Sequence, residues 1–210
     1  MVNEIGVALT ALGGALLYFG IRGYRKTSTS ATAPTAAPKL GIELVPLAMQ
    51  GYNVRSRISP EQWQQTASIT HKRANRPRTT YRCEICHQSG KDQGFKHPVE
   101  CHEVWDYDDE THIQKLTGLV SLCPLCHKAK HYGLAKKQGY ESRVRAHMKQ
   151  VNNWSESELN ASIAQAFHQV KARSDEYWIL DLTYLNTPHL KLNATFTNDE
   201  QANCDKPIFF

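Results

Sequence analysis

The pattern of apolar and polar positions in the middle of the chain predicts a hairpin followed by a helix. Val99–Trp105 has the aliphatic and aromatic content of a strand, and Leu119–Leu122 is a second, largely apolar run typical of a buried strand. Asp106–Glu110 supplies an acidic turn between them. From Cys126 the pattern is helical and ends near Gly139. We therefore expect an α+β fold built around two strands and a helix.

Two capping boxes predict helices on either side of this unit. Ser59 precedes Pro60, and Gln62 stands where its side chain can bond back to the cap. Ser155 and Glu158 repeat the arrangement near the C-terminus. The predicted apolar faces consist of Trp63, Ala67 and Ala74 in the first helix, and of Leu159, Ile163, Phe167 and Val170 in the second.

The C-terminal third contains two weaker patterns. Val144, Met148 and Val151 have the spacing of one helix face. Tyr177–Leu185 alternates enough to be a final strand or a docked extended segment, and residues 187–210 show no periodicity. We expect the tail to be irregular.

The N-terminal segment has a different character. Ile5–Ile21 is uncharged and almost wholly apolar, at the short end of what spans a bilayer core of about 30 Å. Basic and aromatic residues follow it, and Glu4 precedes it, which predicts a retained transmembrane helix with the C-terminal part in the cytoplasm. The alternative is a buried hairpin or core helix. Residues 27–39 are small, polar and broken by proline, so they form a predicted flexible linker.

The length of the chain limits the number of domains, and the distribution of its charge indicates the kind of partner. The chain has 210 residues, room for one ordinary domain with appendages, and a formal charge of +5. A run of basic residues without acids precedes the first CxxC pair and suggests a polyanionic partner; the alternative is a solvated helix end and loop. The run consists of Lys72, Arg73, Arg76, Arg78 and Arg82.

Four of the six cysteines form two CxxC pairs, which predict a closed zinc site. Each pair makes a tight turn that presents two sulfurs to one ion, and thiolates that bind zinc require a reducing compartment. The remaining two, Cys101 and Cys204, are unpaired by spacing. The predicted structural zinc ligands are Cys83, Cys86, Cys123 and Cys126.

Three histidines lie around the second CxxC pair. His127 and His131 are four residues apart and so share a helix face, while His102 lies on the first predicted strand. If the zinc turn folds the helix back across the hairpin, the three imidazoles converge on a second divalent ion with open coordination positions. Taken singly, each histidine is more often a surface or core residue.

The succession CEIC, ECHEVW and LVSLCPLCHKAKH resembles the HNH, or His-Me finger, endonuclease family, over roughly Arg55 to Leu185. The run ECHEVWDYDDETH is similar to a bacterial subgroup described as HNH endonucleases. The resemblance implies a zinc-stapled ββα-metal core with flanking helices. It also implies a catalytic divalent ion, Mg, Mn, Ni or Zn, held by His102, His127 and His131.

The first motif reads His102-Glu103, where the family commonly has His-His or Asp-His. Carried over by position, His102 is a metal ligand and Glu103 occupies the place of the general base, so the candidate catalytic residues are Glu103, His102 and His127. Gly118 stands where the family places an asparagine that orients the base. Glu103 could instead complete the metal shell or be a solvated strand residue, and His112 is a reserve base.

The sequence thus predicts a metal-dependent endonuclease, acting on DNA with RNA not excluded, tethered to the cytoplasmic face of the membrane through residues 5–21. Its parts would be residues 1–26 as anchor and basic flank, 27–39 as linker, 40–186 as the HNH-type domain and 187–210 as tail. The alternative is a catalytically impaired, zinc-stapled module that binds nucleic acid or protein. The predicted phosphate-binding residues are Lys72, Arg73, Arg76, Arg78, Arg82, Lys128 and Lys130.

Overall fold

The computed structural model describes residues 39–75, 81–192, 195–196 and 200–201. The predicted anchor, nearly all of the predicted linker, Arg76, Arg78 and most of the predicted tail lie outside these residues. Within them, no helix combines the length and the apolar character needed to cross a membrane.

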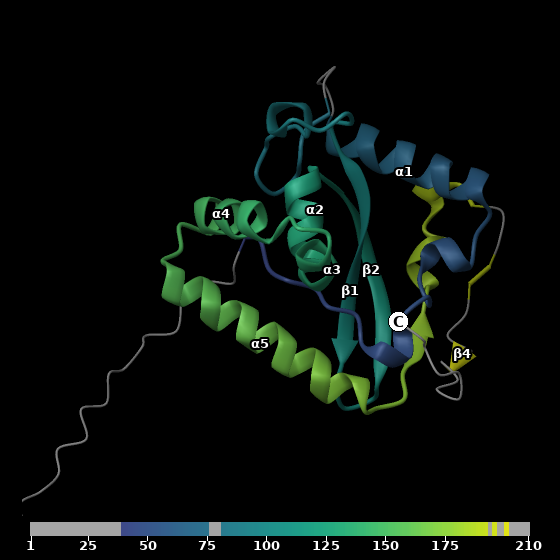
Figure 1. Cartoon of the computed structure of the whole chain (residues 1–210). Coiled ribbons are helices and arrows are strands. Elements are labelled where there is room, and N and C mark those ends of the chain that lie inside the picture. Colours follow the sequence, from purple (N-terminus) through teal and green to yellow (C-terminus); the bar gives the residue numbers. More distant parts are fainter. Residues whose placement is uncertain (1–38, 76–80, 193–194, 197–199, 202–210) are drawn as a thin grey trace, which may run out of the picture. The chain divides into compact units, whose positions relative to one another are not determined.

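The fold is α+β and is organised on one long hairpin (Figure 1). Strand β1 (Glu100–Asp108) pairs antiparallel with β2 (Ile113–Leu122), and a bulge between Val104 and Trp105 shifts the register. The sheet continues in the order β1-β2-β3-β4, with β3 (Ile179–Asp181) parallel to β2 and β4 (Glu200–Gln201) antiparallel to β3. In this sheet β1 is an edge strand.

Both strands are longer than predicted, so the predicted acidic turn is wrong in its position. Asp106 and Asp108 lie within β1, opposite Lys115 and Ile113. The turn that joins the strands comes later, where Asp108 Oδ1 accepts hydrogen bonds from the N–H groups of Glu110 (2.9 Å) and Thr111 (3.0 Å). Polar side chains are tolerated at this end of the hairpin because one face is solvated.

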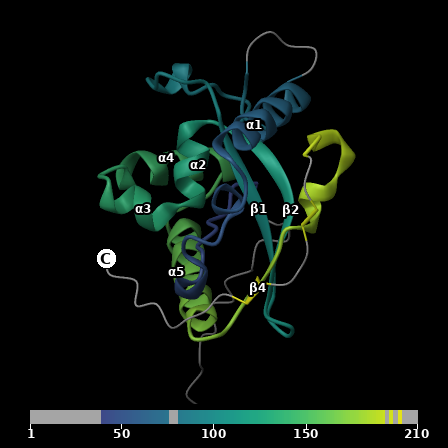
Figure 2. The same cartoon turned by 90° about the vertical axis from the view of Figure 1, so that its right-hand side faces the viewer.

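Helices cover the hairpin on both faces. On one face lie α2 (Pro124–Lys130), α3 (Tyr132–Lys137), α4 (Glu141–Asn152) and α5 (Glu156–Ser174). On the other lies α1 (Pro60–Ala74), together with the C-terminal segment that contains β3 (Figures 1 and 2). Short 3-10 turns occur at Leu47–Met49, Val54–Ser56, Lys91–Gln93, Thr183–Asn186 and Pro188–Leu190.

Each face has its own hydrophobic core. Leu122, Leu125, Tyr132, Met148 and Leu159 belong to the first core, which contains α2, α4 and the two CxxC pairs. The second core lies toward α1 and β3; it contains Leu116, Leu119, Trp178, Leu180 and Leu190. Leu190 is fully buried there, so the packed part of the chain extends beyond residue 186.

Both predicted capping boxes are confirmed. Ser59 Oγ accepts from the N–H of Gln62, whose Oε1 accepts from the N–H of Ser59 at 2.9 Å. Ser155 and Glu158 do the same at the start of α5. The predicted apolar face of α5 is confirmed only in part, because Leu159 is fully buried whereas Phe167 is 42% exposed.

The predicted helix from Cys126 to Gly139 is two helices. The break falls at His131, whose φ of −98° and ψ of 47° lie outside the helical region. His131 therefore stands at the junction of α2 and α3.

Candidate metal centres

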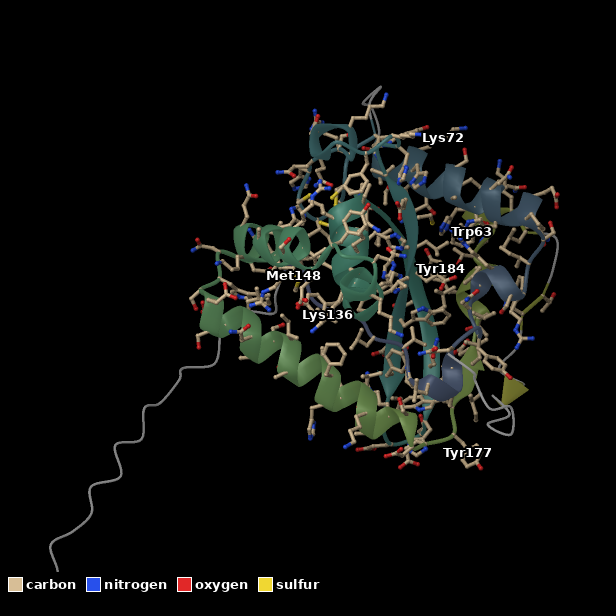
Figure 3. The ribbon with its side chains drawn as sticks, in the orientation of Figure 1. Trp63, Lys72, Lys136, Met148, Tyr177 and Tyr184 are labelled. Atoms are coloured by element: carbon tan, nitrogen blue, oxygen red, sulfur yellow. The ribbon has the colours of Figure 1, made fainter. Side chains whose placement is uncertain are left out.

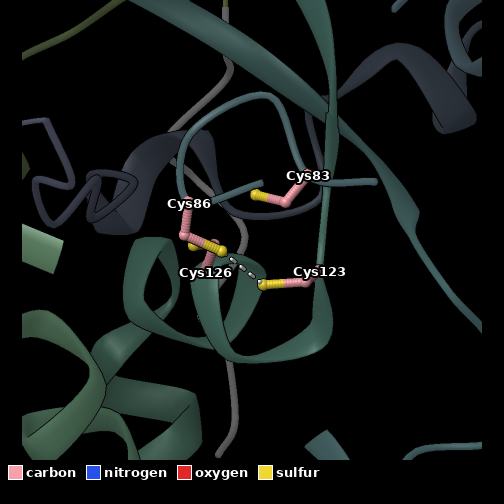
Figure 4. Close-up of side chains that lie close together, drawn as sticks. All are labelled: Cys83, Cys86, Cys123 and Cys126. Carbon is pink, nitrogen blue, oxygen red and sulfur yellow. Dashed lines mark hydrogen bonds between the residues drawn. The ribbon is translucent and has the colours of Figure 1, made fainter. Parts of the chain in front are cut away.

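The four predicted zinc ligands come together at the start of α2 (Figure 4). Cys123 is the N-cap of α2 and Cys126 lies in its first turn, while Cys83 and Cys86 come from the turn before β1. The four sulfurs lie within 4.8 Å of one another, and Cys86 Sγ is 3.4 Å from Cys123 Sγ. Tetrahedral zinc with Zn–S bonds of about 2.3 Å requires sulfurs about 3.8 Å apart. The cluster therefore fits one structural zinc ion.

Groups around the sulfurs complete this site. The N–H of Ile85 donates to Cys83 Sγ (3.4 Å), and Gln93 Nε2 donates to Cys123 Sγ (3.2 Å). His147 Nε2, from α4, lies 3.2 Å from Cys126 Sγ. Donors aimed at sulfur stabilise thiolate, and hydrogen bonds from the neighbouring thiols lower the pKa of Cys123.

Backbone contacts fix the first CxxC turn against the hairpin. The N–H of Glu84 donates to the carbonyl of Ser121 (2.9 Å), and the N–H of Ser121 donates to Glu84 Oε1 (2.7 Å). Gly90 lies so close to α2 that a Cβ there would come within 2.6 Å of Pro124 Cδ and closer still to the carbonyl oxygen of His97. A glycine is needed at this close approach.

The three predicted histidines also converge. His102 projects from β1, His127 from α2, and His131 from the junction of α2 and α3; one nitrogen of each lies within 4.8 Å of the others. The ring centroids form a nearly equilateral triangle with sides of 5.2, 5.0 and 4.9 Å. We call these residues the histidine cluster. Three imidazole ligands leave further coordination positions of a divalent ion open.

Two carboxylates orient this cluster. Glu43 Oε2 lies 2.9 Å from His102 Nε2, and its other oxygen contacts the Lys130 ammonium group. Glu100 contacts His127 Nδ1 with one oxygen and His97 Nε2 with the other. Carboxylates that hold one ring nitrogen of a histidine commonly leave the other nitrogen aimed at a metal.

Electrostatics favour the neutral imidazole form of His102 and His131. Burial, together with the charges of His102 and His127, lowers the pKa of His131 to about 3. Burial also lowers the pKa of His102, although Glu43 opposes this. Burial alone would raise the pKa of Glu100, but the hydrogen bond and charge of His127 outweigh it and lower that pKa to about 2. Neutral imidazole is the form that binds a metal, so these residues fit a divalent ion.

Glu103 lies outside the histidine cluster. Successive strand residues point to opposite sides of a sheet, so its side chain points away from that of His102. Its Oε1 accepts a hydrogen bond from the N–H of Val54 (2.9 Å), and burial raises the pKa of its carboxyl group.

A groove of about 1380 Å³ nevertheless reaches both Glu103 and the histidine cluster. It does so because the segment from Glu43 to Val54 passes the open edge of β1, contacting His102 at one end and Glu103 at the other. His131 also lines this groove, so two of the three clustered imidazoles face it.

His112 and Gly118 lie apart from the cluster. His112 adopts a left-handed conformation in the hairpin turn, with its ring 5.5 Å from that of Trp178. His102 and Asp108 are six residue steps apart along β1, a distance of about 20 Å, and His112 lies beyond Asp108 in the hairpin turn. Gly118 lies opposite Val104 and supplies no side chain to the site.

The predicted phosphate-binding residues that the structure describes are spread over several elements, and Arg76 and Arg78 lie outside the described residues. Lys130 is buried against Glu43, Arg73 donates to the carbonyl of Leu119 (2.7 Å), and Arg82 pairs with Asp92 (3.4 Å). Lys128 lies 4.1 Å from the centre of the Tyr140 ring. Lys72 is exposed near the end of α1, far from α3 (Figure 3).

Three residues of the two sites were missed in the sequence: Glu43, Glu100 and His147. Glu100 had a signal, because it lies two residues before His102 and shares its face of β1. Glu43 and His147 had none, since they are 59 and 21 residues from their partners in the chain.

Comparison of the chain with protein-family models, with curated proteins and with solved structures gave no significant match.

Proposed function

We propose that the protein is a metal-dependent phosphodiesterase of the HNH type that cuts nucleic acid, with DNA as the expected substrate. The observation that carries this proposal is the histidine cluster, set on a hairpin and the following helix and open to a large groove. The four-cysteine cluster joins the turn before β1 to the start of the same helix, in the order that the resemblance implies. Within this proposal, β1, β2 and α2 form the ββα-metal core of the α+β fold.

The ion would be held by His102, His127 and His131, with Glu100 and Glu43 positioning two of the rings. When bound, such an ion supplies Lewis-acid stabilisation of the charge that develops on a phosphate. A borderline ion such as Ni or Zn suits a set of imidazole ligands better than the harder ions Mg and Mn do.

Glu103 is the proposed general base. Glu103 lines the groove that reaches the histidine cluster, and burial raises the pKa of its carboxyl group above the ordinary glutamate value, which makes it a better proton acceptor. It would take a proton from the attacking water. Glu103→Gln is then expected to lower kcat about 100-fold or more while metal affinity is retained.

The first test is plasmid nicking by the full chain with Mg, Mn, Ni or Zn, beside an RNA of matched length. His102→Ala should lower the rate on the order of a thousandfold, because removing a ligand removes several kcal/mol of charge stabilisation. The matched control is His112→Asn, since asparagine tolerates the left-handed backbone at that position. Equal nicking by the wild type and His102→Ala would refute the catalytic assignment.

One contact favours the second candidate, a binding module without turnover. The Glu103 carboxylate already accepts a hydrogen bond from Val54, which competes with proton transfer. Such a module would hold one zinc per chain, bind nucleic acid and leave it intact. Metal analysis beside the nicking assay separates the two functions, because the nuclease requires a second ion.

Location at the membrane is a separate part of the proposal and rests on the apolar segment Ile5–Ile21. We expect the full chain to sediment with membranes and to expose its C-terminal domain on the cytoplasmic side. Deletion of residues 1–26 should release it. Recovery of the full chain in the soluble fraction would contradict this location while leaving the nuclease proposal unaffected.

A further inference from the structure

The groove beside the histidine cluster is lined by more apolar side chains than the binding of phosphates alone would require. Three aromatic side chains line it: Tyr52, Trp105 and Phe167. Leu47, Leu134 and Phe167 are 47%, 56% and 42% exposed, and these groove residues are three of the four large hydrophobic side chains that are exposed in the described part of the chain. Apolar surface gathered in one concave place marks a binding site.

Lysines accompany the aromatic side chains. Lys136 and Lys137 of α3 and Lys171 of α5 line the groove, and Lys136 extends between these two helices (Figure 3). Three carboxylates also line the groove: Glu43, which pairs with Lys130, Glu103, which accepts a backbone N–H, and Asp175. Lys136 in addition lies 3.7 Å from Glu141. Glu43 and Glu103 lie beside β1, whereas the three lysines come from α3 and α5, where Asp175 is the one acidic lining residue. The α3 and α5 side of the groove therefore suits an anion, and His102 and His131 line the same groove.

Duplex and single-stranded nucleic acids differ in what they can offer such a groove. A duplex keeps its bases stacked inside and presents mainly phosphates, which leave an apolar lining without a partner. An unpaired nucleotide exposes the face of its base, which stacks on aromatic and apolar side chains while lysines follow the backbone.

We propose that this groove binds single-stranded nucleic acid, with bases against the Phe167, Leu134 and Tyr52 side chains and the backbone along the lysines toward the histidine cluster. The proposal deepens the nuclease proposal and rests on it for cleavage. Binding itself does not depend on turnover, so the two can fail separately.

The test uses the full chain and three labelled oligonucleotides of one sequence: single-stranded, fully paired, and paired with an internal unpaired bubble. Base stacking contributes about 1–3 kcal/mol per base. One stacked base therefore corresponds to a preference between about 5-fold and 150-fold. We expect kcat/KM and affinity to favour the single strand and the bubble by at least about tenfold. Affinity is measured by fluorescence anisotropy with protein that keeps its zinc but lacks the second ion.

Phe167→Ala should collapse this preference toward one, and Phe167→Tyr should restore it, because a tyrosine ring stacks as well. The matched control is Tyr177→Ala, which removes an aromatic ring that is 67% exposed but does not line the groove. Tyr177→Ala should keep the full preference.

The possible results separate the two proposals. Cleavage of single strand and duplex at equal rates, with equal affinity, would overturn the groove proposal and leave the nuclease standing. Preferential binding of the single strand without cleavage under any metal would support the groove proposal and refute turnover. If the wild type is a dimer in sedimentation and Phe167→Ala is a monomer, the groove is an interface between copies of this chain, and the proposal is wrong.

Discussion

The four-cysteine cluster and the histidine cluster both take residues from the short helix α2. They differ in exposure, because the first is enclosed and the second is open to a groove. The cysteine cluster is enclosed: Ile85, Gln93 and His147 direct hydrogen-bonding groups at its sulfurs. The histidine cluster has three ligands, two of them oriented by carboxylates, and it faces a groove. Closed coordination suits stability and open coordination suits reactivity. A single short helix thus contributes both to an enclosed four-cysteine cluster and to the open histidine cluster that we propose is reactive.

The largest effect on folding is expected when one cysteine of the four-cysteine cluster is replaced. Cys126→Ser removes a thiolate at the centre of the first core, and zinc binding and folding are one equilibrium in such sites. We expect loss of zinc and of cooperative unfolding, measured by metal analysis and circular dichroism. Cys101→Ala is the matched control, because Cys101 is also buried but belongs to the second core. Retained zinc and a native melting transition in Cys126→Ser would contradict the structural role.

The reactive site should behave differently when a ligand is removed. His127→Ala is expected to abolish binding of the second ion and nicking, while zinc content stays at one per chain and the fold persists. Calorimetric titration with Mn or Ni and metal analysis of the same sample measure both. If His127→Ala also loses the cysteine-bound zinc, the two sites are not separable, and the comparison above fails.

A smaller effect is expected from the carboxylate that contacts His127. Glu100→Gln keeps the size of the side chain but removes the charge that favours the correct ring form, and such partners typically contribute 10- to 100-fold in metal affinity. Titration of the second ion against wild type measures the shift. Glu110→Gln, in the exposed hairpin turn, serves as control. An unchanged affinity in Glu100→Gln would remove this residue from the site.

The smallest effect is expected in the pH dependence of the free energy of unfolding. The folded-state pKa of His131 is about 3, below the ordinary value of 6.5, so the unfolded chain binds a proton between these pH values that the folded chain does not. Stability of protein stripped of the second ion should therefore fall as pH decreases from 6.5 toward 3, with a slope of at most about 1.4 kcal/mol per pH unit from this group. Urea unfolding at pH 7 and pH 5 measures it. His131→Gln should show a shallower decline, and an equal decline would exclude His131 as the source.

Local signals in the sequence were sufficient for the capping boxes and for bringing together the four cysteines and the three histidines. A capping box or a CxxC pair depends on residues within four positions, and Ser59, Gln62 and the cysteines behaved accordingly. His127 and His131 were placed on one side because of their spacing, although the helix breaks at the second of them.

The sequence carried no signal for contacts between residues that are far apart in the chain. The segment from Glu43 to Val54 has no periodicity, so its passage around the edge of β1 could not be predicted, and with it the surroundings of His102 and Glu103. The partner of Lys130 could not be predicted for a similar reason, because its position in the sequence does not reveal its contact with Glu43, 87 residues away. The groove itself is formed by segments more than 100 residues apart in the chain.

Cys126 and His127 are consecutive residues of α2. Loss of zinc from the cysteines would therefore also affect the second metal ion that we propose at the histidines. Ejection of zinc, whether by a chelator or by oxidation of its thiolates, releases the turn from which His127 projects. The histidine cluster then loses the fixed position of one of its rings although no residue of the cluster has changed. If the proposed function is right, a shortage of zinc or oxidation of the thiols would therefore abolish activity at the neighbouring histidine cluster.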